Sequence, residues 1–180
     1  MSKWKVVGKK RVFKAPLFEV YSSKIKFESG KEAEYLDVYR KPTVIIFPLT
    51  PKNEIYLISQ KRYLHARFIL EAPAGYIDEN ESSLSAAKRE LKEETGLVAS
   101  HWEQIAKVES SASVIKATAN LFLATDLEEG DATPEELENI EVFKIPIKTA
   151  VEKIFTGEIF TGSTIQGILM IDKLIRDRKL

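Results

Sequence analysis

The stretch from Gly75 to Leu97 combines a loop, the signals of a helix and an unusual density of carboxylates. Ser82 or Ser83 can cap a helix, because a serine hydroxyl accepts a hydrogen bond from a backbone N–H of the first turn. Gly96 stands where a left-handed residue commonly ends a helix. Apolar side chains recur between these points at helical spacing: Leu84, Ala86, Ala87 and Leu91. This stretch predicts a loop, then a helix, then a stop.

Three glutamates share one side of the predicted helix. Glu90 and Glu94 are separated by four residues, so their carboxylates lie one turn apart on one face, and Glu93 joins the same side. Like charges stacked in this way repel each other on an isolated helix. A hard divalent cation with oxygen ligands offsets the repulsion. The alternative is a solvated acidic face neutralised by basic side chains of the same helix.

The spacing of these residues resembles the signature of the Nudix hydrolases. The signature is a glycine, five residues, a glutamate, seven residues, Arg-Glu, an aliphatic residue, any residue, Glu-Glu, any residue, glycine and an aliphatic residue. It begins at Gly75, continues through Glu81 and Arg89, and ends at Leu97, with every specified position filled. The resemblance implies that Glu81 and Arg89 tie the loop to the helix.

A metal site follows from the same resemblance. It implies that Glu90, Glu93 and Glu94 bind Mg²⁺ or Mn²⁺ and that the backbone carbonyl of Ala74 joins them. Cations on a diphosphate neutralise its charge and activate the attacking water. Glu93 is therefore expected among the catalytic residues as well as among the metal ligands.

Composition narrows the class of protein. The chain has 180 residues, enough for one domain or one domain with a small appendage. Its 27 basic residues balance 27 acidic ones, which gives no electrostatic case for binding nucleic acid or a membrane surface. There is no cysteine, so disulfides and thiolate metal sites are excluded. No signal peptide or membrane-spanning run is expected, and a cytoplasmic protein is the expectation.

Charge is unevenly distributed along the chain. Residues 3–14 hold six basic side chains and no acid, whereas residues 126–141 hold eight acidic side chains and no base. Both are interpreted either as solvated segments or as functional ones. In the second interpretation the acidic loop lies near metals, and the basic arm near a polyanionic substrate or a partner subunit.

Alternating and apolar runs predict the remaining elements. Strands are expected at residues 17–28, 32–40, 43–49, 55–60, 102–109, 119–125 and 140–146, helices at 148–156 and 163–178, and an acidic loop at 127–139. Mixed strands with one interposed helix and a helical end favour an α+β sandwich.

The segments that flank the signature resemble the ADP-ribose pyrophosphatase branch of the family. The resemblance lies in Tyr56-Leu-Ile-Ser-Gln-Lys-Arg62 and Leu70-Glu-Ala-Pro-Ala-Gly75. The resemblance implies a Nudix α/β/α sandwich with a mixed sheet, plus a small N-terminal antiparallel β-sheet. Residues 1–41 are expected to form that sheet, for dimerisation and substrate contacts, and residues 42–180 the Nudix hydrolase domain. The branch exchanges this sheet between the subunits of a homodimer.

The branch implies metal-dependent hydrolysis of the diphosphate bridge of ADP-ribose or a related nucleoside diphosphate sugar, such as GDP-mannose. The products are a nucleoside monophosphate and a sugar phosphate. One alternative is a Nudix hydrolase of a nucleoside triphosphate or coenzyme A, and another is a Nudix-fold sensor without turnover. The branch usually has a Ser-Pro-Gly-like loop ending in glutamate. Here Ala112 replaces the proline, and Ala117 or Thr118 the glutamate, which favours a broader specificity.

The resemblance also implies residues that act on the substrate. Glu136 is the first candidate for the general base, in a glutamate-rich loop, and Glu138 is the second. Arg40 and Arg62 match substrate-contacting basic positions, where an arginine fork suits phosphate oxygens. Phe18 is a candidate for stacking on the base. The alternatives are a solvated loop for the glutamates, surface ion pairs for the arginines and a core position for the phenylalanine.

Overall fold

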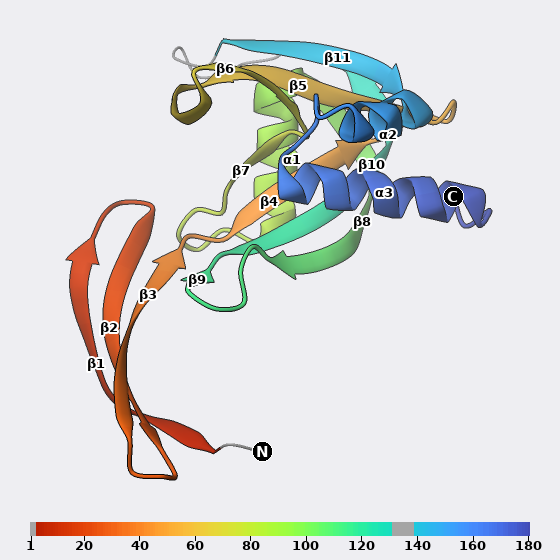
Figure 1. Ribbon diagram of the computed structural model, residues 1–180. Helices are drawn as coiled ribbons and strands as arrows, with labels where there is room; N and C mark the ends of the chain where they lie inside the picture. The colour runs from red at the N-terminus through yellow and green to blue at the C-terminus, as the bar shows by residue number, and fades with distance from the viewer. Residues whose placement is uncertain (1–2, 131–138) are drawn as a thin grey trace. The chain divides into compact units, whose positions relative to one another are not determined.

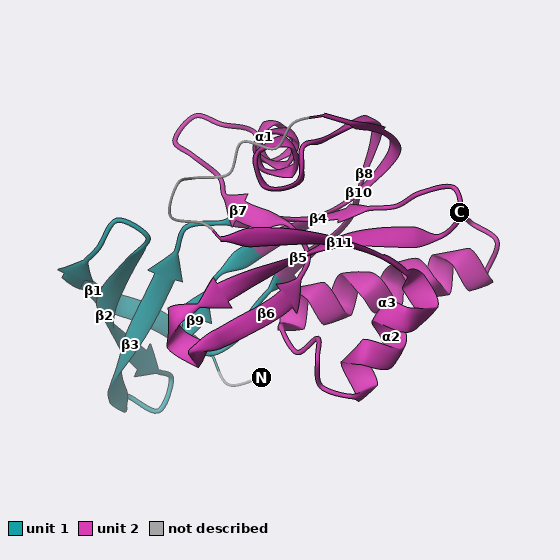
Figure 2. Cartoon of the chain, turned by 90° about the horizontal axis from the view of Figure 1, so that it is seen from above, with its two compact units in different colours: residues 1–42, 109–118 teal, residues 43–108, 119–180 magenta. Residues whose placement is uncertain are grey.

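The structure is a computed structural model that describes residues 3–130 and 139–180. The chain divides into two compact units, residues 1–42 with 109–118, and residues 43–108 with 119–180 (Figure 2). In chain order (Figure 1), the elements are β1 (Trp4–Lys14), β2 (Phe18–Phe27), β3 (Glu32–Arg40), β4 (Thr43–Pro48), β5 (Glu54–Arg62), the 3₁₀ turn η1 (Tyr63–His65), β6 (Arg67–Glu71), β7 (Ala74–Tyr76), α1 (Ser83–Thr95), β8 (Leu97–Glu109), β9 (Ile115–Lys116), β10 (Thr118–Glu129), β11 (Ile140–Pro146), α2 (Ile147–Phe155) and α3 (Gly162–Arg176).

The first unit is a sheet with the strand order β1-β2-β3-β9. The predicted strands at 17–28 and 32–40 are confirmed as β2 and β3, which pair antiparallel. Gly30, with a φ of 84°, forms the turn between them. The short strand β9 comes from the loop after β8 and pairs parallel with β3.

The basic segment at the N-terminus is a strand that was not predicted from the sequence. Strand β1 pairs antiparallel with β2 along its whole length, with register irregularities between Val6 and Gly8 and between Arg11 and Phe13. A bulge adds a residue to one strand and shifts the alternation of side chains to the other face. Because two such shifts lie within one strand, no period-2 pattern survives in its sequence.

The second unit has helices on both sides of mixed strands. Strand β4 pairs parallel with β10 and antiparallel with β7, and a second sheet has the order β11-β5-β6. Helix α1 covers one face of β4 and β10, while α2 and α3 cover the other (Figure 2). The predicted α+β fold, an α/β/α sandwich with a mixed sheet, is confirmed.

The run of apolar residues in β4 explains this layering. Successive side chains of a strand point to opposite faces, so an unbroken apolar run suits a strand covered on both sides. Val44 and Ile46 pack in a cluster with Ala86, Ala87 and Leu91 of α1. Ile45 and Phe47 pack in the other cluster, with Ile168 and Ile171 of α3.

Two strands extend well beyond their predicted bounds. Strand β8 begins at Leu97, directly after Gly96, rather than at residue 102. Strand β10 continues to Glu129, so the predicted acidic loop at 127–139 begins later than expected. Leu127 packs against the α1 cluster and Glu129 accepts a hydrogen bond from the Tyr56 hydroxyl at 3.2 Å, which explains the longer strand. None of the helices in the described part of the chain is long and apolar enough to cross a membrane.

Candidate active site

Helix α1 begins and ends as its sequence predicts. The Ser82 hydroxyl accepts a hydrogen bond from the N–H of Ser85 at 3.0 Å, which satisfies one of the unpaired donors of the first turn. Gly96 ends the helix with a φ of 72°, and its N–H donates to the carbonyl of Lys92. The glutamate face of α1 is therefore fixed at both ends.

Glu94 is the most deeply placed of the three helix glutamates. Its side chain is buried, and Oε2 accepts a hydrogen bond from the N–H of Ala74 at 2.9 Å. Ala74 is the first residue of β7, which pairs antiparallel with β4. This contact places the Glu94 carboxylate against the main chain of Ala74, whose carbonyl oxygen is the other predicted metal ligand.

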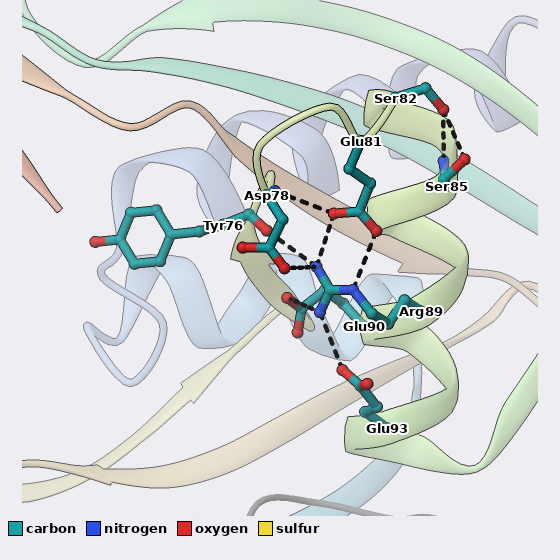
Figure 3. A network of polar contacts seen from close by, with 8 residues as sticks. All are labelled: Tyr76, Asp78, Glu81, Ser82, Ser85, Arg89, Glu90 and Glu93. Atoms are coloured by element: carbon teal, nitrogen blue, oxygen red, sulfur yellow. Dashed lines mark hydrogen bonds and ion pairs between the residues drawn. The ribbon is translucent and has the colours of Figure 1, made fainter. Parts of the chain in front are cut away.

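Arg89 lies at the centre of the polar network that ties the loop to α1 (Figure 3). Its Nε donates to Oε1 of Glu81 at 3.1 Å and its Nη2 donates to Oε2 at 3.0 Å. Nη2 also donates to the carbonyl oxygen of Tyr76 at 3.1 Å. Nη1 contacts Glu90 Oε1 at 2.7 Å and Glu93 Oε2 at 3.1 Å.

The network changes the ionisation of its members. Hydrogen bonds from Arg89 lower the pKa of Glu81 below its ordinary value, with a smaller contribution from the backbone N–H of Asp78. The same hydrogen bonds to Glu81 raise the pKa of Arg89, although burial opposes the rise. Both groups therefore carry their charges throughout the physiological pH range.

The absence of a side chain at Gly75 makes room for Glu90. A β-carbon built on Gly75 lies 1.8 Å from Glu90 Oε1 and 1.9 Å from its Cδ, far inside van der Waals contact. Any other residue at this position therefore pushes the Glu90 carboxylate away from β7. This observation gives a physical reason for the glycine that opens the signature.

Gly75→Ala is expected to lower kcat/KM by roughly 10- to 100-fold, the usual effect of changing a group that orients a metal ligand, which is the role predicted for Glu90. Stability should change little, because the displaced group is the end of a flexible side chain. Steady-state kinetics and a thermal melt measure both effects. In a Glu90→Ala background the same substitution should have no further kinetic effect, and a full additional loss there would contradict the steric explanation.

The donor set fits a hard divalent cation, because it consists of carboxylate and carbonyl oxygens. Within residues 3–130 and 139–180, no three acidic or histidine side chains are already gathered as a complete metal site. Nη1 of Arg89 donates hydrogen bonds to one oxygen of Glu90 and one of Glu93. The carboxylates are close together, and a guanidinium group compensates their charge.

The structure places Arg62 in an ion pair. Its Nε and Nη2 both lie 2.7 Å from Oε1 of Glu71, and this acceptor is buried while the arginine side chain is 40% exposed. Glu71 was not among the predicted site residues, although it lies in Leu70-Glu-Ala-Pro-Ala-Gly75, within the segment that resembles the branch. Thr164 of α3 was missed as well; its buried hydroxyl accepts a hydrogen bond from the N–H of Ala72 at 3.1 Å.

Phe18 and Arg40 lie in the first unit, directly opposite each other in the register of β2 and β3. Both are exposed, and the Phe18 ring lies 5.6 Å from the ring of Phe13. The two predicted substrate residues are thus neighbours on one sheet. The predicted catalytic residues Glu136 and Glu138 lie outside the described residues.

Comparison with known proteins agrees with this geometry. The model of the NUDIX domain matches residues 39–156, more than half of the chain. The ADP-ribose pyrophosphatase of Bacillus subtilis is 26% identical over 91% of this chain and 90% of its own length. The ADP compounds hydrolase NudE of Escherichia coli is 29% identical over 78% of this chain and 74% of its own. A crystal structure of an ADP compounds hydrolase has a TM-score of 0.85 at 22% identity, covering 98% of this chain and 96% of that one.

The sequence resemblance to Nudix hydrolases of the ADP-ribose pyrophosphatase branch is thereby confirmed. The matched segment includes the loop, helix α1 and the three glutamates on it. The chain belongs to the Nudix family of hydrolases.

Proposed function

We propose that this Nudix hydrolase cleaves the diphosphate bridge of ADP-ribose or a related nucleoside diphosphate sugar, and that it requires Mg²⁺ or Mn²⁺. The observation that carries the proposal is the convergence of Glu94 with Ala74, beside Glu90 and Glu93 on the same helix face. The names of the relatives support the substrate class, since two of them act on ADP-ribose or ADP compounds.

The reaction adds water across one phosphoanhydride bond. The water oxygen attacks a phosphorus atom, the bridging P–O bond breaks, and a nucleoside monophosphate and a sugar phosphate leave. A bound divalent cation neutralises the diphosphate and lowers the pKa of water near it. Glu90, Glu93 and Glu94, with the Ala74 carbonyl, would hold that cation. The N–H of Ala74 orients Glu94, and the missing side chain at Gly75 leaves the space that Glu90 uses.

Other residues are assigned to the substrate as part of the same proposal. Glu136 or Glu138 would accept the proton of the attacking water. Glu93, on helix α1, would also take part in catalysis, as a ligand of the cation. Arg62 would bind phosphate oxygens, because Glu71 holds its guanidinium by Nε and Nη2 and leaves Nη1 for a further acceptor. Arg40 and Phe18 would contact the nucleoside.

We also propose a homodimer in which residues 1–41 exchange between subunits and residues 42–180 form the hydrolase domain. The first unit exposes several large apolar side chains: Trp4, Val6, Val12, Phe13 and Leu36. Each of these side chains is more than half exposed. Large exposed apolar side chains gathered on one small sheet favour a protein partner. The molar mass by light scattering tests this part of the proposal.

The function is tested with a panel of ADP-ribose, GDP-mannose, UDP-glucose, NADH, dGTP and coenzyme A, with Mg²⁺ and a coupled phosphatase. We expect turnover of the nucleoside diphosphate sugars that a chelator abolishes and added Mg²⁺ restores. The ranking of ADP-ribose against GDP-mannose measures how far the altered loop at residues 110–118 broadens the specificity.

Two outcomes would change the proposal. Turnover of dGTP or coenzyme A alone would move the substrate to another class within the family. If the nucleoside diphosphate sugars were hydrolysed at an unchanged rate in the presence of chelator, the metal requirement would be rejected.

A further inference from the structure

The guanidinium group of Arg89 performs two separable tasks (Figure 3). Nε and Nη2 bind Glu81, and Nη2 also binds the carbonyl oxygen of Tyr76, so this edge holds the loop against the helix. Nη1 instead donates to Glu90 and Glu93, at 2.7 and 3.1 Å. Nε and Nη2 therefore bind the loop, and Nη1 donates hydrogen bonds to two proposed metal ligands.

We propose that Nη1 of Arg89 is an exchangeable internal counterion for the metal site. It holds Glu90 and Glu93 in the metal-free protein, a divalent cation displaces it, and the competition sets the affinity for that cation. The inference rests on the metal-dependent function proposed above and adds a residue that tunes it. Glu94 is secured separately by the N–H of Ala74.

Competition follows from the chemistry of the carboxylates. An oxygen that accepts a short charge-assisted hydrogen bond must give up that bond, or share it, when it binds a metal. Two cations in one cluster also repel each other. The lost hydrogen bond therefore subtracts from the binding of the metal, and a bond of this class corresponds to roughly tenfold in an equilibrium constant.

The surroundings restrict how the competition can be relieved. Glu90 cannot retreat toward β7, because its carboxylate already fills the place of a side chain at Gly75. Arg89 cannot leave as a whole without breaking its paired contacts with Glu81. The guanidinium group is planar and rigid, so Nη1 keeps its position while Nε and Nη2 bind Glu81. The carboxylates of Glu90 and Glu93 must therefore turn away from Nη1 to exchange it for a cation.

The test is Mn²⁺ binding at neutral pH, followed by electron paramagnetic resonance, in the wild type and in two variants. Arg89→Gln removes the counterion, and we expect it to bind Mn²⁺ roughly tenfold more tightly than the wild type. Glu81→Ala is the matched control, because it removes the acceptors of Nε and Nη2 in the tie between loop and helix but keeps the guanidinium charge beside Glu90 and Glu93. It should bind Mn²⁺ as weakly as the wild type or more weakly.

A different result is expected if Arg89 only holds the loop against the helix and does not compete with the cation. Both variants would then loosen the same loop and weaken Mn²⁺ binding to a similar extent, which would overturn the proposal. Failure of the wild type to bind Mn²⁺ at all, or binding that Glu94→Gln leaves unchanged, would overturn the metal assignment itself. The two failures are therefore distinguishable.

A measurement on the wild type alone covers the case in which Arg89→Gln does not fold. Nitrogen-15 NMR of the arginine side chain reports rotation about the bonds from Cζ to the terminal nitrogens. Saturation with Mg²⁺ should accelerate rotation at Nη1 and leave the Nε resonance, bound to Glu81, in place. Rotation at Nη1 that stays hindered at saturating Mg²⁺ would contradict the exchange.

Discussion

If Glu94 binds the proposed cation, Glu94→Gln is expected to lower kcat/KM for the proposed nucleoside diphosphate sugar substrate by roughly a thousandfold, the rate equivalent of the several kcal/mol that metal ligation contributes. The carboxylate of Glu94 is buried and already oriented by the N–H of Ala74. A glutamine oxygen can accept the same hydrogen bond, but it brings no charge to a cation. The substitution therefore removes the charge of the proposed ligand while keeping its shape and the backbone contact.

The folded structure should tolerate this change. A buried carboxylate replaced by an amide of the same size leaves the Ala74 donor satisfied, so the free energy of unfolding without metal should change by less than about 1 kcal/mol. Glu103→Gln, on the exposed side of β8, is the control for charge and should be kinetically silent. Normal turnover by Glu94→Gln, with an unchanged requirement for Mg²⁺, would rule out Glu94 as a ligand.

The glutamate cluster could be predicted because its spacing within one helix determines its geometry. Residues separated by three and four positions lie on one helix face whatever the rest of the fold does, and Ser82 and Gly96 fix the ends locally. The strand β4 was predictable for a similar reason, since an unbroken apolar run of that length suits burial on both faces.

Contacts between distant segments could not be predicted. The ion pair between Arg62 and Glu71 depends on the register of β5 against β6, which no local pattern specifies. Strand β1 was missed because its two irregularities break the alternation that identifies a strand. The signature predicted that Arg89 meets Glu81, but the contact of its Nη1 with Glu90 and Glu93 depends on side-chain conformation rather than on spacing.

Gly167→Ala is expected to destabilise the second unit, although alanine is the better helix former. Gly167 lies inside α3, where replacing glycine by alanine would ordinarily add about 1 kcal/mol of stability. A β-carbon at this position, however, lies 1.9 Å from Cζ of Phe47. Phe47 is fully buried in the core beneath α3, so its ring has no empty space to enter.

The steric clash with Phe47 therefore decides the sign of the change in the free energy of unfolding. Overpacking a dense core costs about 1 to 3 kcal/mol and more when the backbone must shift, so we expect a net loss of about 2 kcal/mol. For a chain of this length that corresponds to a fall in Tm of roughly 4 to 8 °C. Gly162→Ala is the matched control, because it lies at the start of the same helix with nothing within 4 Å of the added carbon.

A double-mutant cycle identifies the cause of the loss. Phe47→Leu shortens the ring that opposes the helix and should cost stability by itself, since it leaves a cavity. In that background Gly167→Ala should cost much less, because the added methyl group enters the vacated space. Residues in direct contact give such coupling, whereas independent sites give additive effects. Additive losses in the cycle, or a Tm for Gly167→Ala equal to that of Gly162→Ala, would show that α3 packs on β4 less closely than the contact with Phe47 requires.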